Sequence, residues 1–254
     1  MAEAKLKASK QRAFEEKWHD RFKDFAGKND DDAGIAGWSQ SGLEARLRGF
    51  ARVLEKDKPG SFWLDAGCGA GTYSRFLAGR ELQVVGCDYS FPTLLKARDR
   101  GGDTINWCVS DVKKLPIKPG VFDGVLCFGV TQALLDSERV VAELSSVIKT
   151  GGQLWMDALN GWCLPHLWEK FRRRLQGKPM HLRYESPRAL KRLMKQNNVG
   201  DLRLYWLPIL PSRWQRFQWL VETPAIIKLF HAIPLLGVLF SHAFIIRGEK
   251  IRET

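Results

Sequence analysis

Three glycines at alternate positions follow an acid in the segment Leu64–Gly71, which reads LDAGCGAG. Glycines in such a segment let the backbone approach a ligand closely, and a helix that follows offers free N–H groups to an anion. A tight strand-to-helix turn would use the same glycines without any ligand. The segment stands between an expected strand and an expected helix, which favours a ligand-binding turn.

Two further acids stand at the ends of apolar runs. Asp88 ends the run Leu82–Asp88 and comes 21 residues after Gly67. An acid at that distance, at the tip of a second strand, can accept hydrogen bonds from both hydroxyls of a ribose. The alternative role of Asp88 is to cap the helix that follows it. Asp111 comes just after the run Ile105–Val109 and could accept a hydrogen bond from an adenine amino group.

These acids and glycines need a scaffold that brings them to one edge, and the apolar pattern predicts one. Strands are expected at 61–66, 82–87, 105–109, 122–128 and 154–158, and helices at 72–78, 92–100 and 138–149. The flanking segments add helices at 41–56 and 186–197 and strands at 201–209 and 242–250. Strands and helices that alternate at this pace predict a parallel sheet with helices on both faces. Ligands bind such a sheet beyond the carboxyl ends of its strands.

The motifs between about Phe62 and Asp157, taken in order, resemble the class I S-adenosylmethionine (SAM)-dependent methyltransferases, in the UbiE and methyltransferase-11-like branch. The resemblance implies an α/β fold with a Rossmann-like, doubly wound, seven-stranded and mostly parallel sheet whose last strand is antiparallel. It also implies SAM as cofactor and methyltransferase activity. The expected parts are an N-terminal helical segment at 1–60, a SAM-binding core at 61–160, and the rest of the fold at 161–254 with lid insertions at 161–184 and 212–240.

The same resemblance places the cofactor on the glycine-rich turn and on the strand ends that follow. Asp88 would hold the ribose and Asp111 the adenine. The cofactor-binding residues expected from it are Asp65, Gly67, Cys68, Gly69, Gly71, Asp88, Tyr89, Asp111, Val112 and Phe128. The position of Asp65 ahead of the glycines also favours a cofactor that carries an ammonium group.

A nicotinamide-dependent dehydrogenase is the natural competitor, because it also uses a glycine-rich turn and a distal acid. Its motif is G-x-G-x-x-G/A. The third glycine of this chain, Gly71, comes one residue too early, and Thr72 stands where the motif needs Gly or Ala. The spacing therefore favours the methyltransferase.

Length and composition are those of a globular protein. The chain has 254 residues, of which 44% are hydrophobic and 27% charged, which excludes disordered and collagen-like chains. The five cysteines form no CxxC pair, so we expect reduced thiols and neither a disulfide framework nor a metal site. The longest nearly apolar run, 232–246, has 15 residues, short of the roughly 18 that span a bilayer. We expect a cytoplasmic protein, and peripheral attachment to a membrane stays open.

The net charge of +12 is concentrated in one part of the chain. Residues 170–216 hold thirteen lysines and arginines against two acids, and the apolar, aromatic insertion 212–240 follows. Such a stretch attracts nucleic acid, anionic lipid or an anionic substrate, or is only a solvated basic face. Combined with the apolar insertion, it favours a small, lipophilic or amphiphilic anionic acceptor, methylated on O or N, and an anionic membrane surface as a partner.

The acceptor site is less well defined by the sequence. A sulfonium is already a strong electrophile, so methyl transfer depends mainly on alignment of the acceptor. His166 and His181 are candidates for a general base, and Trp38 and Asn160 for acceptor binding. RNA, such as tRNA, stays open as an alternative acceptor because aromatics interleave the basic stretch. A SAM-binding protein without catalysis is a third alternative, disfavoured by intact motifs.

Overall fold

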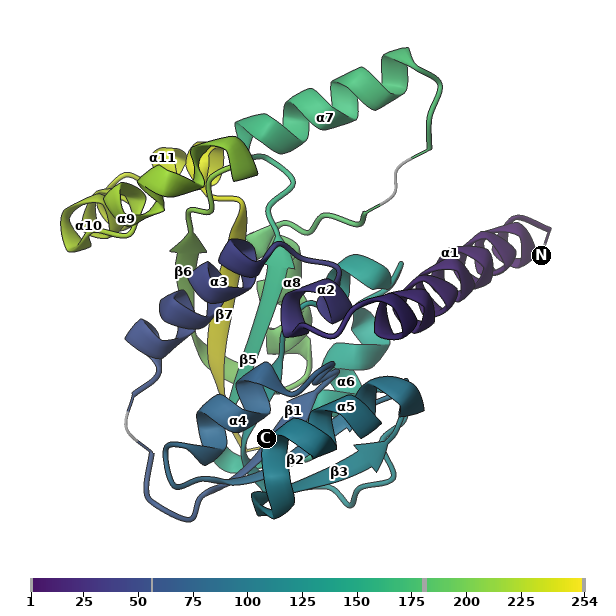
Figure 1. The fold of residues 1–254 in the computed structure, drawn as a ribbon, viewed down its shortest axis with the longest axis vertical. Coiled ribbons are helices and arrows are strands. Elements are labelled where there is room, and N and C mark those ends of the chain that lie inside the picture. The colour runs from purple at the N-terminus through teal and green to yellow at the C-terminus, as the bar shows by residue number, and fades with distance from the viewer. Residues whose placement is uncertain (1, 56, 180–181, 253–254) are drawn as a thin grey trace.

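The computed structural model describes residues 2–55, 57–179 and 182–252 (Figure 1). Its strands are β1 (Phe62–Ala66), β2 (Gln83–Asp88), β3 (Ile105–Val109), β4 (Phe122–Cys127), β5 (Ile148–Leu159), β6 (Val199–Leu207) and β7 (Ala243–Lys250). They form one sheet of seven strands in the order β3-β2-β1-β4-β5-β7-β6, in which β7 runs antiparallel to β5 and β6. The predicted fold, a doubly wound sheet with an antiparallel last strand, is confirmed.

Helices precede, separate and follow these strands. The chain begins with α1 (Ala2–Lys28), α2 (Asp32–Ala36) and α3 (Gln40–Val53). The core contains α4 (Thr72–Ala78), α5 (Phe91–Gly101), α6 (Glu138–Ser146) and α8 (Pro187–Gln196). The remaining α-helices are α7 (Leu164–Leu175), α9 (Gln218–Val221), α10 (Pro224–Ala232) and α11 (Pro234–Phe240), and short 3-10 helices span Gly102–Thr104, Thr131–Ala133 and Ser212–Phe217.

Both faces of the sheet are apolar and buried, because successive residues of a strand point to opposite faces. Trp63 and Trp155 lie on the face that packs against α3 and α4. Leu64 and Phe244 lie on the other face, in the cluster that holds the apolar side chains of α6 and α8. All four side chains are almost fully buried. This two-sided burial explains why the central strands read as continuous apolar runs.

The boundary between α6 and β5 differs most from the sequence prediction, which expected the strand only at 154–158. The apolar spacing predicts a helix over 138–149, but α6 ends at Ser146 and β5 begins at Ile148. The carbonyl of Val147 accepts hydrogen bonds from the N–H groups of Val121 and Phe122. Sheet pairing with the start of β4 therefore takes the chain out of the helix before its apolar period ends.

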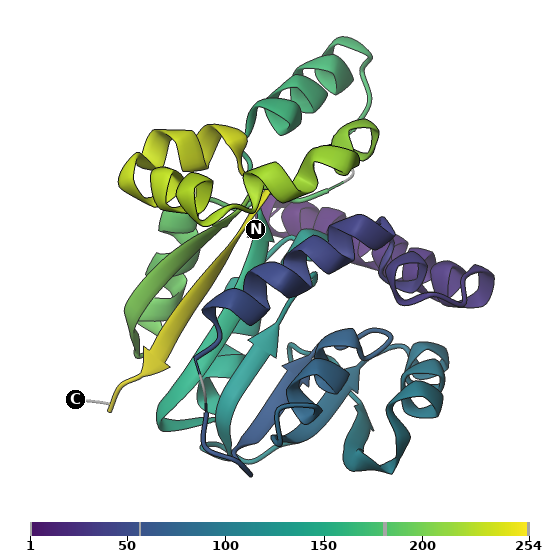
Figure 2. The same ribbon diagram turned by 60° about the vertical axis from the view of Figure 1, so that its left-hand side comes forward.

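The two predicted insertions lie at one end of the molecule. Residues 161–184 include α7, and residues 212–240 include the 3-10 helix Ser212–Phe217 and helices α9, α10 and α11. Both views place them beyond the carboxyl end of β5 (Figures 1 and 2). Throughout the described ranges, no helix has both the length and the apolar character needed to cross a membrane.

Candidate active site

The glycine-rich turn joins β1 to α4 and forms one wall of a cavity, here called the first cavity. Gly67 and Gly69 line it and have φ angles of 77° and 52°. A Cβ on Gly67 would lie 2.3 Å from Val130 Cγ2, whereas a Cβ on Gly69 would meet nothing within 4 Å. Gly67 is therefore required by packing, while Gly69 leaves open space beside the turn.

Asp88 ends β2 and faces this turn. Its Oδ2 accepts a hydrogen bond from the N–H of Gly69 at 3.0 Å, and its Oδ1 accepts one from the N–H of Ser90 at 2.8 Å. Asp88 lines the first cavity and is only 8% exposed. Burial raises the pKa of this carboxyl above its usual value, while the backbone hydrogen bonds lower it. Each oxygen keeps a lone pair that no backbone donor occupies.

Asp65 takes a different position from the one the motif suggested. Its Oδ2 accepts a hydrogen bond from the hydroxyl of Ser74 on α4 at 2.6 Å, and it is not among the described residues that line the first cavity. Burial raises the pKa of Asp65 to about 7. Gly71 also lies outside the described lining, and a Cβ there would lie 2.6 Å from Trp107 Cη2. Both residues support the turn between sheet and helix.

The other predicted cofactor residues do meet at the first cavity. Its lining includes Cys68, Tyr89, Asp111, Val112 and Phe128. The Oδ1 of Asp111 accepts a hydrogen bond from the N–H of Lys113 at 2.9 Å. The hydroxyl of Tyr89 is buried and has no hydrogen-bond partner among the residues that the structure describes. A buried hydroxyl of this kind is available to a ligand.

The N-terminal segment covers the first cavity, which the sequence analysis did not predict. Trp18, His19 and Phe22 of α1 contribute to its lining. The ring of His19 stacks on that of Tyr89 with centroids 3.7 Å apart. The signal in the sequence is the spacing of Trp18, Phe22 and Phe25 along one face of an otherwise charged helix.

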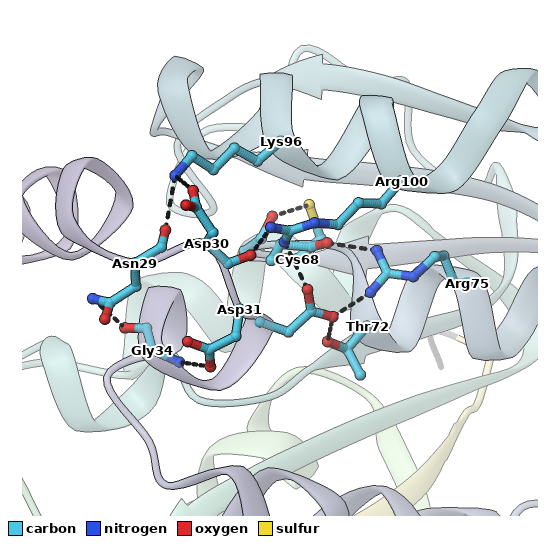
Figure 3. Close-up of polar contacts among 12 residues, drawn as sticks. Asn29, Asp30, Asp31, Gly34, Cys68, Thr72, Arg75, Lys96 and Arg100 are labelled. Carbon is cyan, nitrogen blue, oxygen red and sulfur yellow. Dashed lines mark hydrogen bonds and ion pairs between the residues drawn. The ribbon is translucent and has the colours of Figure 1, made fainter.

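Ion pairs attach this segment to the core. Arg75, Lys96 and Arg100 reach from α4 and α5 towards residues 29–32 (Figure 3). Asp32 pairs with both arginines, at 2.7 Å from its Oδ1 to Nη1 of Arg100. Lys96 Nζ lies 2.9 Å from an oxygen of Asp30. The cover is thus held by charges at the rim of the cavity.

A second cavity, of about 380 Å³, adjoins the first. Trp18, Ala36 and Trp38 line both cavities, so these side chains form a shared wall. The volume lies within the range of ligand-binding pockets. The second cavity is lined mainly by apolar side chains, with the polar side chains Ser39, Arg46, Gln132, His166, Gln215 and His242 among them.

His166 lines the second cavity, in agreement with a role near an acceptor. Its Nδ1 lies 2.7 Å from the carbonyl oxygen of Asn160. A carbonyl only accepts, so Nδ1 carries the proton and Nε2 of the neutral ring keeps its lone pair. Burial lowers the pKa of His166, which favours the neutral ring. The second candidate base, His181, lies outside the described residues.

Asn160 has a structural role in the described structure. Its Nδ2 donates to the carbonyls of Val238 and Ser241, at 2.7 and 2.8 Å, and its Oδ1 accepts from the N–H of Trp162 at 3.0 Å. Its side chain is fully buried and does not line either cavity. Asn160 therefore joins the end of β5 to α11 and to Ser241, which stands between α11 and β7.

Residues 64–156 match the Methyltransf_11 family model, described as a methyltransferase domain. A human protein named "Probable tRNA methyltransferase 9B" is 35% identical over 118 residues, which are 45% of this chain and 24% of that protein. A ubiquinone biosynthesis O-methyltransferase from Chromobacterium violaceum is 33% identical over 101 residues, 38% of this chain and 44% of the relative. The matches thus span less than half of each relative's own length.

The fold is also similar to that of solved methyltransferases. The crystal structure of magnesium protoporphyrin IX methyltransferase from Synechocystis, with bound S-adenosylhomocysteine (SAH), superposes with a TM-score of 0.59. The alignment covers 96% of this chain and 99% of that one at 16% identity. At this identity the likeness defines the fold and leaves the acceptor open.

Proposed function

We propose that this chain binds SAM in the first cavity and transfers its methyl group to an acceptor in the second. The proposal starts from the methyltransferase domain that residues 64–156 match and from the class I fold around it. The observation that carries this proposal is the position of Asp88. Its buried carboxylate lines the same cavity as Gly67 and Gly69 and retains acceptor capacity. A similar structure holds SAH.

The residues of the first cavity fit such a cofactor. Asp88 at the end of β2 would accept from the ribose hydroxyls, and Asp111 after β3 would accept from the adenine amino group. The open space beside Gly69 accommodates a ligand against the turn. SAM supplies an electrophilic methyl group when it is bound, so this chain has to orient the acceptor and exclude water.

We assign the role of general base to His166. A hydroxyl or phenol acceptor must lose a proton as its oxygen attacks. The unprotonated Nε2 of His166, held in one tautomer by the carbonyl of Asn160, is suited to take that proton. Under this assignment, methyl transfer falls at pH values below the lowered pKa of His166, because the ring is then already protonated.

The acceptor in this proposal is a small amphiphilic molecule with an anionic group. The second cavity offers apolar walls from residues such as Leu159, Ile209 and Leu210, together with the cation Arg46. The curated bacterial relative named above acts in ubiquinone biosynthesis by its printed name.

We also propose that α7 places the enzyme on an anionic membrane surface. Four apolar side chains of α7 form a stripe at helical spacing and are between 46% and 72% exposed, namely Leu164, Trp168, Phe171 and Leu175. The last turn of the helix carries Arg172, Arg173 and Arg174. Exposed aromatic and basic side chains on one helix are typical of interfacial helices. Pro165 and His166 of the same helix line the second cavity, so a bound membrane would lie beside it.

The activity is tested with SAM carrying a labelled methyl group and with separate lipid, small-molecule and RNA fractions. We expect label in an organic-soluble acidic product, and a SAM requirement about 10- to 100-fold higher for the Asp88→Ala variant. Label in RNA alone would contradict the small-molecule acceptor. Unchanged cofactor affinity in the folded Asp88→Ala variant would remove Asp88 from the site.

The membrane part has its own test. We expect the wild-type protein to sediment with vesicles of phosphatidylserine and phosphatidylcholine. The Trp168→Ser/Phe171→Ser variant should stay in the supernatant. Phe91→Ser is the matched control, because Phe91 is 57% exposed but belongs to α5. Equal sedimentation of all three proteins would exclude the α7 stripe as the contact.

RNA is a second candidate acceptor. The relatives named tRNA methyltransferase 9B in human, mouse and cattle support it, at 34–35% identity over 118 residues. The basic residues of α8, Arg188, Lys191, Arg192 and Lys195, line one groove and would contact phosphates. RNA binding through this groove would be lost in Lys191→Gln/Arg192→Gln and weakened by added salt.

A further inference from the structure

Arg46 on α3 is an unusual residue for its position, because its guanidinium is buried and poorly bonded. It is 4% exposed and lines the second cavity. Its Nη1 donates to the carbonyl of Gly42 over a long 3.4 Å, and its Nε has no hydrogen-bond partner among the described residues. A guanidinium has five N–H donors. Buried donors that lack acceptors are costly unless something else supplies one.

The neighbours of Arg46 fix its position. Its Cζ lies 4.2 Å from the ring centroid of Trp38, a cation–π contact with a residue of the wall shared by both cavities. The Oδ2 of Asp157 lies 3.6 Å from its Nε, beyond hydrogen-bond length. The Oδ1 of Asp157 already accepts from the N–H of Gly129 at 2.7 Å. Asp157 thus balances the charge of Arg46 through a long ion pair.

The other polar side chains of this cavity carry no competing charge. His166 and His242 both line it, with ring centroids 4.4 Å apart. Burial lowers the pKa of both rings, and the charge of Arg46 lowers that of His242 further. The rings therefore stay neutral, and Arg46 is the cation that an entering ligand meets in the described lining.

From these observations we infer that Arg46 is the anchor of the acceptor, binding an oxyanion group, a carboxylate or a phosphate, while the apolar body of the acceptor lies along Leu182, Ile209 and Leu210. The inference rests on the proposed methyl transfer, and it specifies which acceptors the second cavity takes. A planar fork of donors suits carboxylate and phosphate because it can bond to two oxygens at once.

The chemistry of the second cavity also disfavours two classes of acceptor. An amine or sulfonium head group would place a second cation beside Arg46, and Asp157, which already balances Arg46, would have to balance both. A neutral lipid alcohol has a single oxygen to accept from the guanidinium and carries no charge to balance that of Arg46. An oxyanion satisfies the donors and places Arg46 between two negative groups, an arrangement that its delocalised charge supports.

The experiment uses decanoate, decyl phosphate and decanol as probes, titrated by calorimetry into the full-length protein saturated with SAH. We expect both anionic probes to bind more tightly than decanol. The Arg46→Gln variant should weaken binding of the anionic probes by about 10- to 100-fold, the size of a lost charge-assisted contact. Its affinity for decanol should change by less than about threefold. Preference for decanoate or for decyl phosphate tells which oxyanion the site takes.

Asp157→Asn is the matched control for the buried pair. The asparagine Oδ1 can still accept from Gly129, while Arg46 keeps its charge and loses a competing carboxylate. We therefore expect Asp157→Asn to bind decanoate at least as tightly as the wild type. Weakening by Asp157→Asn equal to that by Arg46→Gln would show that the pair is only structural, and would overturn the inference.

Two further measurements keep the result interpretable. Arg46→Gln leaves Asp157 buried without its cation, which destabilises the fold, so the double variant Arg46→Gln/Asp157→Asn is measured as well. The double variant should fold, and it should still bind the anionic probes more weakly than the wild type does. SAH affinity separates this inference from the proposed function. A wild type that does not bind SAH contradicts the proposed function, whereas SAH binding with equal affinity for decanoate and decanol contradicts only the anchor.

Discussion

Asp65 offers a quantitative test of how the turn between β1 and α4 is built. Its carboxyl is 2% exposed, accepts one hydrogen bond from Ser74, and has a pKa raised by burial from 3.8 to about 7. An acid whose pKa is raised in the folded state binds more protons folded than unfolded. Its contribution to stability is therefore present at low pH and is lost as the pH rises from near 4 through about 7.

The magnitude follows from the two pKa values. Between them, stability falls by about 1.4 kcal/mol per pH unit, and integration from pH 5 to pH 8 gives a loss of about 2.5 kcal/mol from this one group. The Asp65→Asn variant has no proton to lose. The asparagine Oδ1 can still accept from the hydroxyl of Ser74, so the fold should persist.

The assay is urea unfolding of wild type and Asp65→Asn at several pH values between about 5 and 8. Other buried acids, Asp88 and Asp157 among them, titrate in both proteins and cancel in the difference. Between about pH 5 and pH 8, we expect the free energy of unfolding of the variant to rise by about 2.5 kcal/mol relative to that of the wild type. Ser74→Ala should enlarge the pH dependence, because the hydroxyl lowers the pKa of Asp65. If the difference in free energy of unfolding between wild type and Asp65→Asn stays constant with pH, burial does not raise the pKa of Asp65.

The remaining predictions concern the first cavity and its cover. Asp88→Ala should weaken SAH binding about 10- to 100-fold in calorimetry, through loss of a charge-assisted contact, and unchanged affinity would argue against ribose binding there. Gly69→Val should abolish SAH binding, since its side chain enters the open space beside the turn, and at a φ of 52° it should also strain the backbone. Gly67→Ala adds a clash with Val130 to the strain of a φ of 77° and should destabilise the fold by about 1–3 kcal/mol; SAH binding retained by Gly69→Val would contradict the role assigned to Gly69. Asp32→Asn should release α1, seen as faster tryptic cleavage before residue 29 and weaker SAH binding, and a protection pattern equal to wild type would show that the ion pairs do not hold the cover.

The strands of the sheet could be predicted from the sequence because each depends on a local apolar run, and the family resemblance implied how they assemble. The apolar runs at 82–87 and 105–109 are long enough for buried strands, and β2 and β3 occupy them to within a residue. Asp88 was identified because its strand ends in an acid at a fixed distance from the glycines. Both signals are carried by neighbouring residues in the chain.

Side-chain direction and long-range cover could not be predicted in the same way. Asp65 stands in the expected motif, but its carboxyl turns to Ser74 on α4, and only the packing of α4 on the sheet decides this. Arg46 lies in a helix with many charged residues and reads as a surface arginine. Its burial depends on Trp38 and Asp157, of which Asp157 is more than a hundred residues away. Asn160 appears polar and free in sequence, yet its amide is fully used by Val238, Ser241 and Trp162.

The wall shared by the two cavities has a kinetic consequence. Trp18, on α1, faces both the first and the second cavity. Under the proposed function, we expect the cofactor to enter and leave when α1 moves aside, a movement that would also open the second cavity. An acceptor in the second cavity would then be held firmly only after the cofactor is in place and α1 has returned. We expect a compulsory order of binding, with SAH as the last product to leave and its release, rather than the chemical step, setting the turnover rate.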